Sequence, residues 1–324
     1  HNFLIRSSGY PLHLIKVSLS GLPSDSSVVL KNETHSFSIG ADEIVTFYAY
    51  NYSELSVSDE YIYVNENVRY VCEDPTQIIK GPGEIVFNFY PEYKVIVGIE
   101  PDDFFKYGIL KVNGLDYRFP LSGWFEKGYN LSVSVPLEVG NEGQRYIFEG
   151  WSTGESKNYI VLTVDSPVSV YANYRTQYFV SVVSDFGNVE GEGWYDKGSK
   201  ATIKVLETVI YGERKDARYV FSGWEPMGLT DPVLEVTVYE PMVIEAKWTT
   251  QYRVEVVSPY GDVIVSDDWV PEGGEVMVEV SSRSMGLIVK KVFSYWVDQD
   301  NNKYEDAKVR IKINKPTKLT AVWV

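Results

Sequence analysis

The sequence has almost no cysteine and few histidines. It holds one cysteine, Cys72, so no disulfide can form within the chain, and a secreted protein of this kind must stabilise its domains in another way. The three histidines are His1, His13 and His35, so neither His nor Cys occurs after residue 92. Without them, neither a zinc site nor a Ser-His-Asp triad can be built in that region.

Long apolar runs and an excess of basic residues are also missing. No apolar run reaches the ~18 residues that a membrane-spanning helix needs. The net charge of −15 argues against a nucleic-acid partner, because phosphates repel an acidic surface. There is no Gly-rich phosphate loop and no Asp-Thr-Gly or Asp-Ser-Gly pair of the aspartic-protease type. The sequence therefore predicts a protein that is not an enzyme and does not span a membrane.

Aromatic side chains are plentiful and recur in a fixed order. All eight Trp lie at three kinds of motif. The first is Trp with a polar turn that ends in Gly: "GWFEKG" (Trp124), "GWYDKG" (Trp194) and "DWVPEG" (Trp269). The second is an aromatic run into a further Trp: "RYIFEGW" (Trp151), "RYVFSGW" (Trp224) and "KVFSYW" (Trp296). The third is Pro with a strand and a closing aromatic: "PVSVYANY" (Tyr174), "PMVIEAKW" (Trp248) and "PTKLTAVW" (Trp323).

The same order divides the chain into four repeats. "VYANYRTQYFVSVV" and "EAKWTTQYRVEVV" align Gln177 with Gln251, 74 residues apart, which indicates a repeating unit. The first 92 residues fit more loosely, through "RYVCED", where Cys72 replaces the later Phe, and through "GEIVFNFYPEYKV". We predict a divergent first repeat with an additional N-terminal strand, 1–92, and three closer repeats, 93–176, 177–250 and 251–324, which abut without linkers.

The repeats have the pattern of β-strands. Apolar and polar residues alternate with period two in stretches such as "YFVSVV" and "VLEVTVYE", and Gly, Pro and Asp clusters mark turns. We therefore expect an all-β protein of four tandem small β-sandwich modules, Ig-like or β-grasp-like. A module of this size is marginal without a large buried core, so we expect Trp124, Trp151, Trp194, Trp224, Trp269 and Trp296 to be mostly buried and structural. Sugar stacking by the same Trp side chains is the functional alternative.

At these motifs the sequence resembles the divergent InlB B-repeat family, found on bacterial and archaeal surface proteins. The resemblance is carried by "YFVSVVSDFGNVEGEGWYDKGSKATIKV", "YVFSGW" and "PMVIEAKWTTQY", and it covers residues 93–324. "GWYDKG" and "TQY" are also similar to surface proteins of thermophilic archaea, including surface-layer components. The resemblance implies a spacer or building block of the cell envelope, and it carries over no catalytic residue.

Two kinds of candidate site remain. Asp298, Asp300 and Asn302 alternate like the start of a calcium loop, although the Gly of an EF-hand is missing and an Asp/Asn-rich turn is the favoured interpretation. Calcium is thus the one cofactor to consider. Asn32, Asn51 and Asn130 begin Asn-x-Ser/Thr sequons, and we expect a glycan on at least one of them in a secreted host context.

The segment "HNFLIRSSGY" has no counterpart in the other repeats. Its apolar residues Phe3, Leu4 and Ile5 would suit a strand, donated to a neighbouring subunit or paired within its own repeat. We therefore predict a secreted, structural cell-surface protein that forms a homo-polymer, as a lattice or filament, or joins other cell-envelope proteins. The alternatives are an adhesin or glycan-binding stalk, and an accessory region of a secreted hydrolase.

Overall fold

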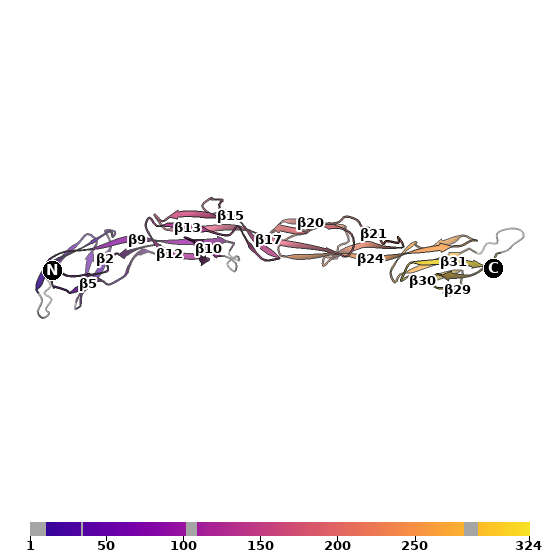
Figure 1. Ribbon diagram of the computed structural model, residues 1–324, viewed down its shortest axis with the longest axis horizontal. Coiled ribbons are helices and arrows are strands. Elements are labelled where there is room, and N and C mark those ends of the chain that lie inside the picture. Colours follow the sequence, from indigo (N-terminus) through magenta and orange to yellow (C-terminus); the bar gives the residue numbers. More distant parts are fainter. Residues whose placement is uncertain (1–10, 34, 102–108, 282–290) are drawn as a thin grey trace. The chain divides into compact units, whose positions relative to one another are not determined.

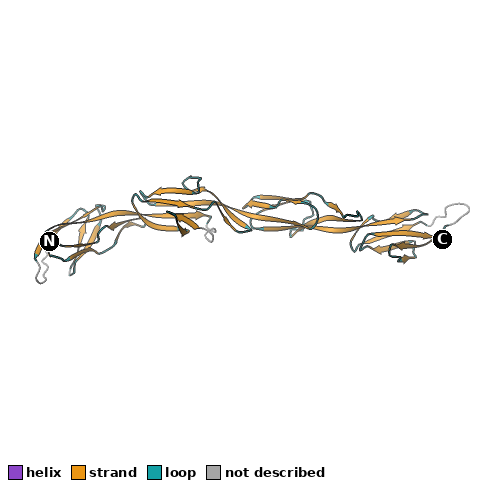
Figure 2. Cartoon of the chain, in the orientation of Figure 1, coloured by secondary structure: helices purple, strands orange, loops and turns teal. Residues whose placement is uncertain are grey.

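The computed structural model describes residues 11–33, 35–101, 109–281 and 291–324. Within these residues every regular element is a β-strand, and none of them forms a helix that could cross a membrane (Figure 2). The strands form because apolar and polar residues alternate along the sequence. For example, β20 (Lys200–Val205) buries Ala201, Ile203 and Val205 and turns the residues between them outward. The all-β fold class is confirmed.

The chain divides into two compact units, which are described separately. The first unit comprises residues up to Gly140 together with Tyr146–Arg175, and the second comprises Asn141–Arg145 and Thr176–Val324. In the first unit, the strands of residues 11–100 are β1 (Leu12–Ser20), β2 (Ser27–Lys31), β3 (Ser36–Gly40), β4 (Ile44–Tyr50), β5 (Glu54–Val57), β6 (Tyr61–Asn65), β7 (Val68–Cys72), β8 (Thr76–Ile78) and β9 (Gly83–Glu100). The following strands are β10 (Ile109–Val112), β11 (Leu115–Arg118), β12 (Leu121–Glu126), β13 (Asn130–Ser134), β14 (Glu138–Gly140), β15 (Gln144–Trp151), β16 (Tyr159–Thr163) and β17 (Val168–Ser184) (Figure 1).

In the second unit, the strands after β17 are β18 (Val189–Glu190), β19 (Gly193–Asp196), β20, β21 (Val209–Tyr211), β22 (Ala217–Glu225), β23 (Val233–Thr237) and β24 (Met242–Val257). The last are β25 (Val263–Val265), β26 (Trp269–Pro271), β27 (Glu275–Val280), β28 (Phe293–Asp298), β29 (Lys303–Tyr304), β30 (Lys308–Lys312) and β31 (Thr317–Trp323).

The opening strand of each repeat pairs in parallel with the strand that closes the same repeat. β1 pairs with β9, the second half of β9 with the first half of β17, the second half of β17 with β24, and the end of β24 with β31. Parallel neighbours need a long crossover connection, and here the remaining strands of the repeat supply it. The long strands β9, β17 and β24 therefore each take part in two consecutive repeats.

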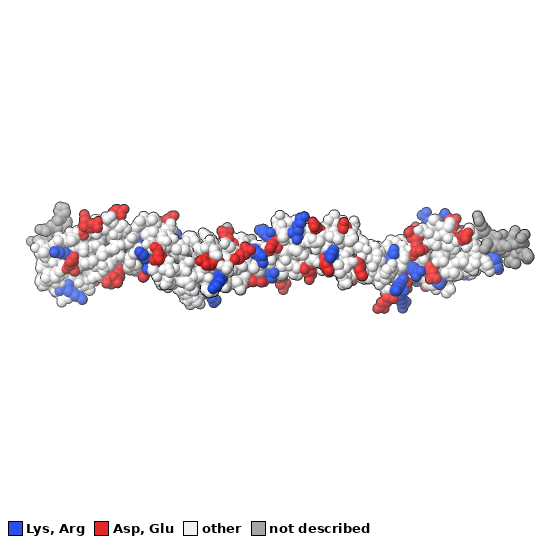
Figure 3. Space-filling view, turned by 90° about the horizontal axis from the view of Figure 1, so that it is seen from above, with Lys and Arg blue, Asp and Glu red and all other residues white. Residues whose placement is uncertain are grey.

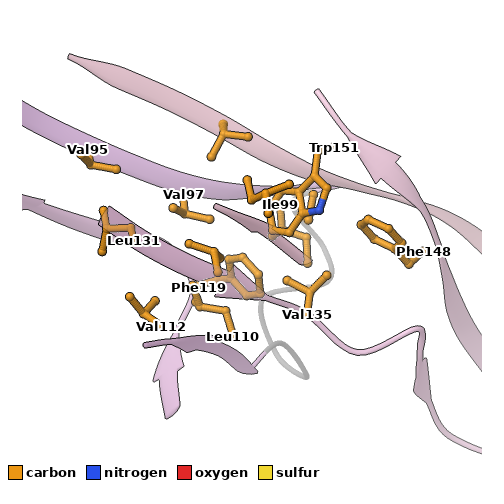
Figure 4. Close-up of a cluster of buried hydrophobic side chains, with 14 of the residues drawn as sticks. Val95, Val97, Ile99, Leu110, Val112, Phe119, Leu131, Val135, Phe148 and Trp151 are labelled. Atoms are coloured by element: carbon orange, nitrogen blue, oxygen red, sulfur yellow. The ribbon is translucent and has the colours of Figure 1, made fainter. Parts of the chain in front are cut away.

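The apolar side chains gather in four clusters. Two lie in the first unit, over residues Ile15–Phe89 and Val95–Tyr174, and two in the second, over Tyr178–Ala246 and Val254–Ala321. In the cluster of Figure 4, Val97 and Ile99 of β9 face Leu110 of β10, and the ring of Trp151 lies beside them. The predicted repeat boundaries at residues 92, 176 and 250 fall inside β9, β17 and β24, so no linker separates the clusters.

The Gly that follows each first Trp has a left-handed backbone. Gly128, Gly198 and Gly273 have φ of 85°, 81° and 78°. Their N–H groups donate to the carbonyl oxygens of Val164, Val238 and Ile313, at 2.8, 2.7 and 2.7 Å. A residue with a Cβ is strained at such φ values, which explains why Gly recurs four residues after each of these Trp.

Candidate functional sites

The most regular polar arrangement in the molecule lies where one repeat passes into the next. In the second compact unit, Arg218 of β22 lies opposite Gln251 of β24, and its Nε donates to Gln251 Oε1 at 2.8 Å. The Arg218 guanidinium carbon is 4.6 Å from the ring centroid of Trp269, the first Trp of the next repeat. Tyr211 packs on the same indole at 5.7 Å, edge to face. Arg218 therefore connects two consecutive repeats.

The same contacts recur one repeat earlier. Arg145 Nε donates to Gln177 Oε1 at 2.8 Å, and the Arg145 guanidinium carbon is 4.4 Å from the ring of Trp194. Gln177 is 8% exposed, and its side-chain nitrogen donates to Asp196 Oδ1 at 2.8 Å, which satisfies both ends of its amide. Phe179 packs edge to face on Trp194 at 5.3 Å.

In the first compact unit a carboxylate takes the place of the amide. Arg69 Nε and Nη2 both lie 2.6 Å from Glu92 Oε2, and the two side chains are 13% and 14% exposed. The Arg69 guanidinium carbon is 3.8 Å from the ring centroid of Tyr61 and 4.7 Å from that of Trp124. Burial lowers the pKa of Arg69, but the hydrogen bonds to Tyr63 and Glu92 outweigh this effect. The net pKa is raised above its usual value, so the guanidinium stays charged.

We call each of these arrangements an Arg–Trp clamp: Arg69 with Trp124, Arg145 with Trp194, and Arg218 with Trp269. A guanidinium over an indole contributes ~0.5–2 kcal/mol, more when water is excluded. The planar Arg can stack and hydrogen-bond at once, which Lys cannot do. The clamps explain why Gln177 and Gln251 align in the sequence. Each Gln accepts a hydrogen bond from the Arg that stacks on the Trp of the following repeat. The signal was present in the sequence, as the Arg of "RYVC", "RYIF" and "RYVF".

The six Trp are expected to be mostly buried, and for three of them the burial is confirmed as complete or nearly so. Trp151, Trp224 and Trp296 are 3%, 0% and 0% exposed. Trp124, Trp194 and Trp269 are partly exposed, and their rings lie in the clamps and not in the four hydrophobic clusters. The two groups differ in what covers the ring: an Arg lies over each of these three indoles, and Phe179 and Tyr211 pack on the edges of Trp194 and Trp269.

The three sequon asparagines have different surroundings. Asn130, at the start of β13, is exposed, and its Oδ1 accepts a hydrogen bond from Thr163 at 2.8 Å. Asn51 is half-buried, and its side-chain nitrogen lies within 3.2 Å of Ile79 O and 3.1 Å of Lys80 O, as donor to both. Asn32 is half-buried, and its Oδ1 accepts from His35 N at 2.8 Å. Asn130 therefore presents the most accessible amide.

The calcium candidate forms a hairpin between β28 and β29. Asp298 Oδ1 accepts from the backbone N–H of Asp300 at 2.9 Å and of Asn302 at 2.8 Å, and Oδ2 accepts from Asn302 Nδ2 at 2.8 Å. Asp300 forms an ion pair with Lys315 at 2.5 Å. Partial burial raises the pKa of Asp298, but the hydrogen bonds from Asn302, Asp300 and Tyr304 together lower it below its usual range. These contacts are those of an Asx-type turn.

Among the described residues, no group of three or more His, Cys, Asp or Glu is arranged to hold a metal ion. Figure 3 shows Lys and Arg interspersed with Asp and Glu over the face in view. A groove of about 320 Å³ in the second unit is richer in cations, since Arg214, Lys215 and Arg253 line it beside the Lys318–Glu255 pair. Arg214, Lys215 and Arg253 are exposed, and Asp216 and Glu255 line the same groove, so water and these carboxylates compete with any small anion there.

The assembly residues Phe3, Leu4 and Ile5 lie outside the described residues. The strand that follows them, β1, has neighbours on both sides, β4 antiparallel and β9 parallel. An incoming strand would therefore have to pair at another edge of the first repeat, since β1 offers none.

No protein-family model matches the sequence, and no curated protein matches it. Among solved structures, the chain is similar to one titled "Structure of the Streptococcal ancillary pilin", with 9% identity over 73% of this chain and 98% of that chain and a TM-score of 0.17. It is also similar to the pilus adhesin SpaC from Lactobacillus rhamnosus GG in its open conformation, with 9% identity over 97% of this chain and a TM-score of 0.17. The chain spans 43% of the length of the adhesin. Scores this low do not establish a common fold, and no function follows from them.

Proposed function

We propose that the chain is a structural protein of the cell surface and a subunit of an extracellular lattice or filament. The observation that supports this most is the Arg–Trp clamp, which recurs beside all three proposed repeat boundaries, with its Arg hydrogen-bonded to a strand that two repeats share. Separating two repeats joined in this way requires breaking both backbone pairing and a stacked side chain. A flexible linker between domains would need neither. Joints of this kind suit a protein that carries mechanical load.

We further propose that each of the four repeats, 1–92, 93–176, 177–250 and 251–324, is one β module around its own hydrophobic cluster. The shared strands support this organisation, since each ends one cluster and begins the next. In this proposal, the continuous strands β9, β17 and β24 connect consecutive modules in place of flexible linkers.

For the partner, we propose further copies of the same chain, with other cell-envelope proteins as the alternative. Donation of the segment around Phe3, Leu4 and Ile5 to a neighbouring subunit would give a head-to-tail polymer, because such an interface does not close on itself. Pairing of this segment within its own repeat would leave assembly to other surfaces.

Electron microscopy of the purified protein tests the proposal. We expect ordered polymers without added ligand, and folded protein that forms no polymer when residues 1–8 are deleted. Polymers that persist after the deletion would exclude strand donation while retaining the structural role. A wild-type protein that stays monomeric at high concentration but binds glycans would favour the adhesin interpretation instead.

A further inference from the structure

The four-stranded sheet of the second repeat has an open edge. The strand order is β11-β10-β13-β16, so among the strands of the described residues β16 has a neighbour on one side only. Val135 N donates to Asn158 O and Val164 N to Tyr129 O, which directs the backbone groups of residues 158, 160, 162 and 164 toward β13. The N–H and C=O groups of Tyr159 and Val161 therefore point to the open side, beside a groove of about 460 Å³ that these two residues help to line.

The corresponding edges of the other repeats are protected. β23 has Glu235 at its centre, and β30 has Arg310 at its centre with Lys308 and Lys312 at its ends, all with exposed side chains. β8 in the first repeat has only three residues and follows Pro75. Charges, short strands and Pro are the usual means by which sheet edges avoid pairing with another chain.

The outward side chains of β16 carry no charge. Tyr159, Val161 and Thr163 are exposed, with Tyr159 at 50% and Val161 at 64%. Val161 occupies the position of Glu235 in β23 and of Arg310 in β30. The edge therefore lacks the protection present at the same place in the next two repeats.

The β16 edge is also complementary to itself. In an antiparallel pair centred on Val161, Val161 of one copy lies opposite Val161 of the other, and the two exchange both backbone hydrogen bonds. Tyr159 then lies opposite Thr163. The flanking residues continue the register: Lys157 lies opposite Asp165, and both are exposed. The two ends of the pair thus carry opposite charges.

Antiparallel self-pairing is unfavourable at the β23 and β30 edges. A β23 pair would place Glu235 opposite Glu235, and a β30 pair would place Arg310 opposite Arg310 and Lys308 opposite Lys312. Like charges directly opposite each other destabilise a cross-strand pair. Among these edges, self-pairing is favourable in the second repeat alone.

We propose that β16 is a homotypic interface, through which two copies of this chain pair edge to edge, antiparallel, around a two-fold axis at Val161. The interface is isologous and closes at two copies, so it differs from a head-to-tail contact and can join two polymers laterally. It does not depend on donation of the N-terminal segment or on the function proposed above.

Sedimentation equilibrium of the full-length protein over a range of concentrations tests this pairing. At concentrations below the onset of polymerisation we expect a dimer of the wild type, and we expect Val161→Glu to weaken dimerisation at least ~10-fold, because Glu then lies opposite Glu. High salt should restore part of the loss by screening that repulsion. An equimolar mixture of Val161→Glu and Val161→Lys chains should dimerise, although each alone does not.

Val243→Glu is the matched control, since Val243 is 66% exposed on β24, where it pairs with Ser181 of β17. It should dimerise as the wild type does. Wild-type protein that is monomeric at all concentrations, or dimers that Val161→Glu leaves unchanged, would overturn the proposal. A continuous ladder of larger species that Val161→Glu does not alter would also overturn it, while leaving the proposed polymer intact.

Discussion

Arg218 donates to Gln251 at 2.8 Å while its guanidinium stacks on Trp269 at 4.6 Å. One side chain therefore satisfies a polar group on the shared strand β24 and covers an aromatic ring of the next repeat. The equivalent Arg145 and Arg69 do the same with Trp194 and Trp124. Three copies of one contact, each beside a predicted repeat boundary, indicate that the contact belongs to the repeat pattern.

Arg218→Ala should destabilise the second compact unit. The variant loses the stacking on Trp269 and leaves the Gln251 carbonyl without its donor, so we expect the free energy of unfolding to fall by ~1–3 kcal/mol. Guanidinium unfolding followed by Trp fluorescence measures this change. Arg214→Ala is the control, since that Arg is exposed and forms no ion pair with the part of the chain that the structure describes, and the variant should stay within ~0.5 kcal/mol of wild type. Equal effects of the two substitutions would contradict a structural role for the clamp.

The indole N–H groups of Trp224 and Trp296 should differ in their contribution to the free energy of unfolding. Both rings are fully buried, but Trp224 Nε1 donates to Asp231 O at 3.0 Å, whereas Trp296 Nε1 has no partner among the described residues. Replacement by Phe removes a hydrogen bond at the first position and an unpaired donor at the second. We therefore expect Trp224→Phe to cost ~1–2 kcal/mol more than Trp296→Phe.

Trp224→Ala should cost ~3–5 kcal/mol, because a large cavity replaces the ring in the core of the third repeat. Differential scanning calorimetry of Trp224→Phe, Trp296→Phe and Trp224→Ala gives all these comparisons. A Trp224→Ala protein that melts with the wild type would refute the structural role of this Trp.

The Asp298 hairpin should lose stability in acid. The folded-state pKa of Asp298 is lowered, so its contribution is fully present above the unfolded-state pKa of ~3.9 and is lost as the pH falls through the folded-state value. In Asp298→Asn this pH dependence is removed. We expect the difference in melting temperature between wild type and Asp298→Asn to be largest near neutral pH and to close at the lowest pH.

The same two proteins test calcium. With millimolar calcium in place of a chelator, a bound ion would raise the melting temperature of the wild type and leave Asp298→Asn unchanged. An identical wild-type curve in both buffers would exclude the calcium hypothesis and leave the turn as the role of Asp298, Asp300 and Asn302.

Glycan in the native host should be found at Asn130 before Asn51. Asn130 is exposed on β13, while the Asn51 side chain is held by the carbonyl oxygens of Ile79 and Lys80. Glycopeptide mass spectrometry of protein from its own host measures the occupancy of Asn32, Asn51 and Asn130. A modified Asn51 beside a bare Asn130 would contradict this order, and an intact mass equal to that of the bare sequence would exclude glycosylation altogether.

The sequence by itself determined the strand class and the repeat. Alternation in stretches such as β20 indicated strands because side chains on a pleated strand face opposite sides, and Gly128, Gly198 and Gly273 marked turns because only Gly adopts their φ without strain. The buried roles of Trp151, Trp224 and Trp296 also followed from their fixed places. All these properties are local or periodic, and a single sequence shows them.

The tertiary structure alone decided what lies between the repeats. The parallel pairing of β9 with β17 and of β17 with β24 joins residues about 70 positions apart, and no local pattern specifies such partners. For the same reason, Trp194 and Trp269 could not be distinguished in sequence from core residues: what covers them is an Arg of the preceding repeat. The open edge of β16 likewise depends on strand order, because whether the backbone groups of Val161 have partners is a property of the sheet.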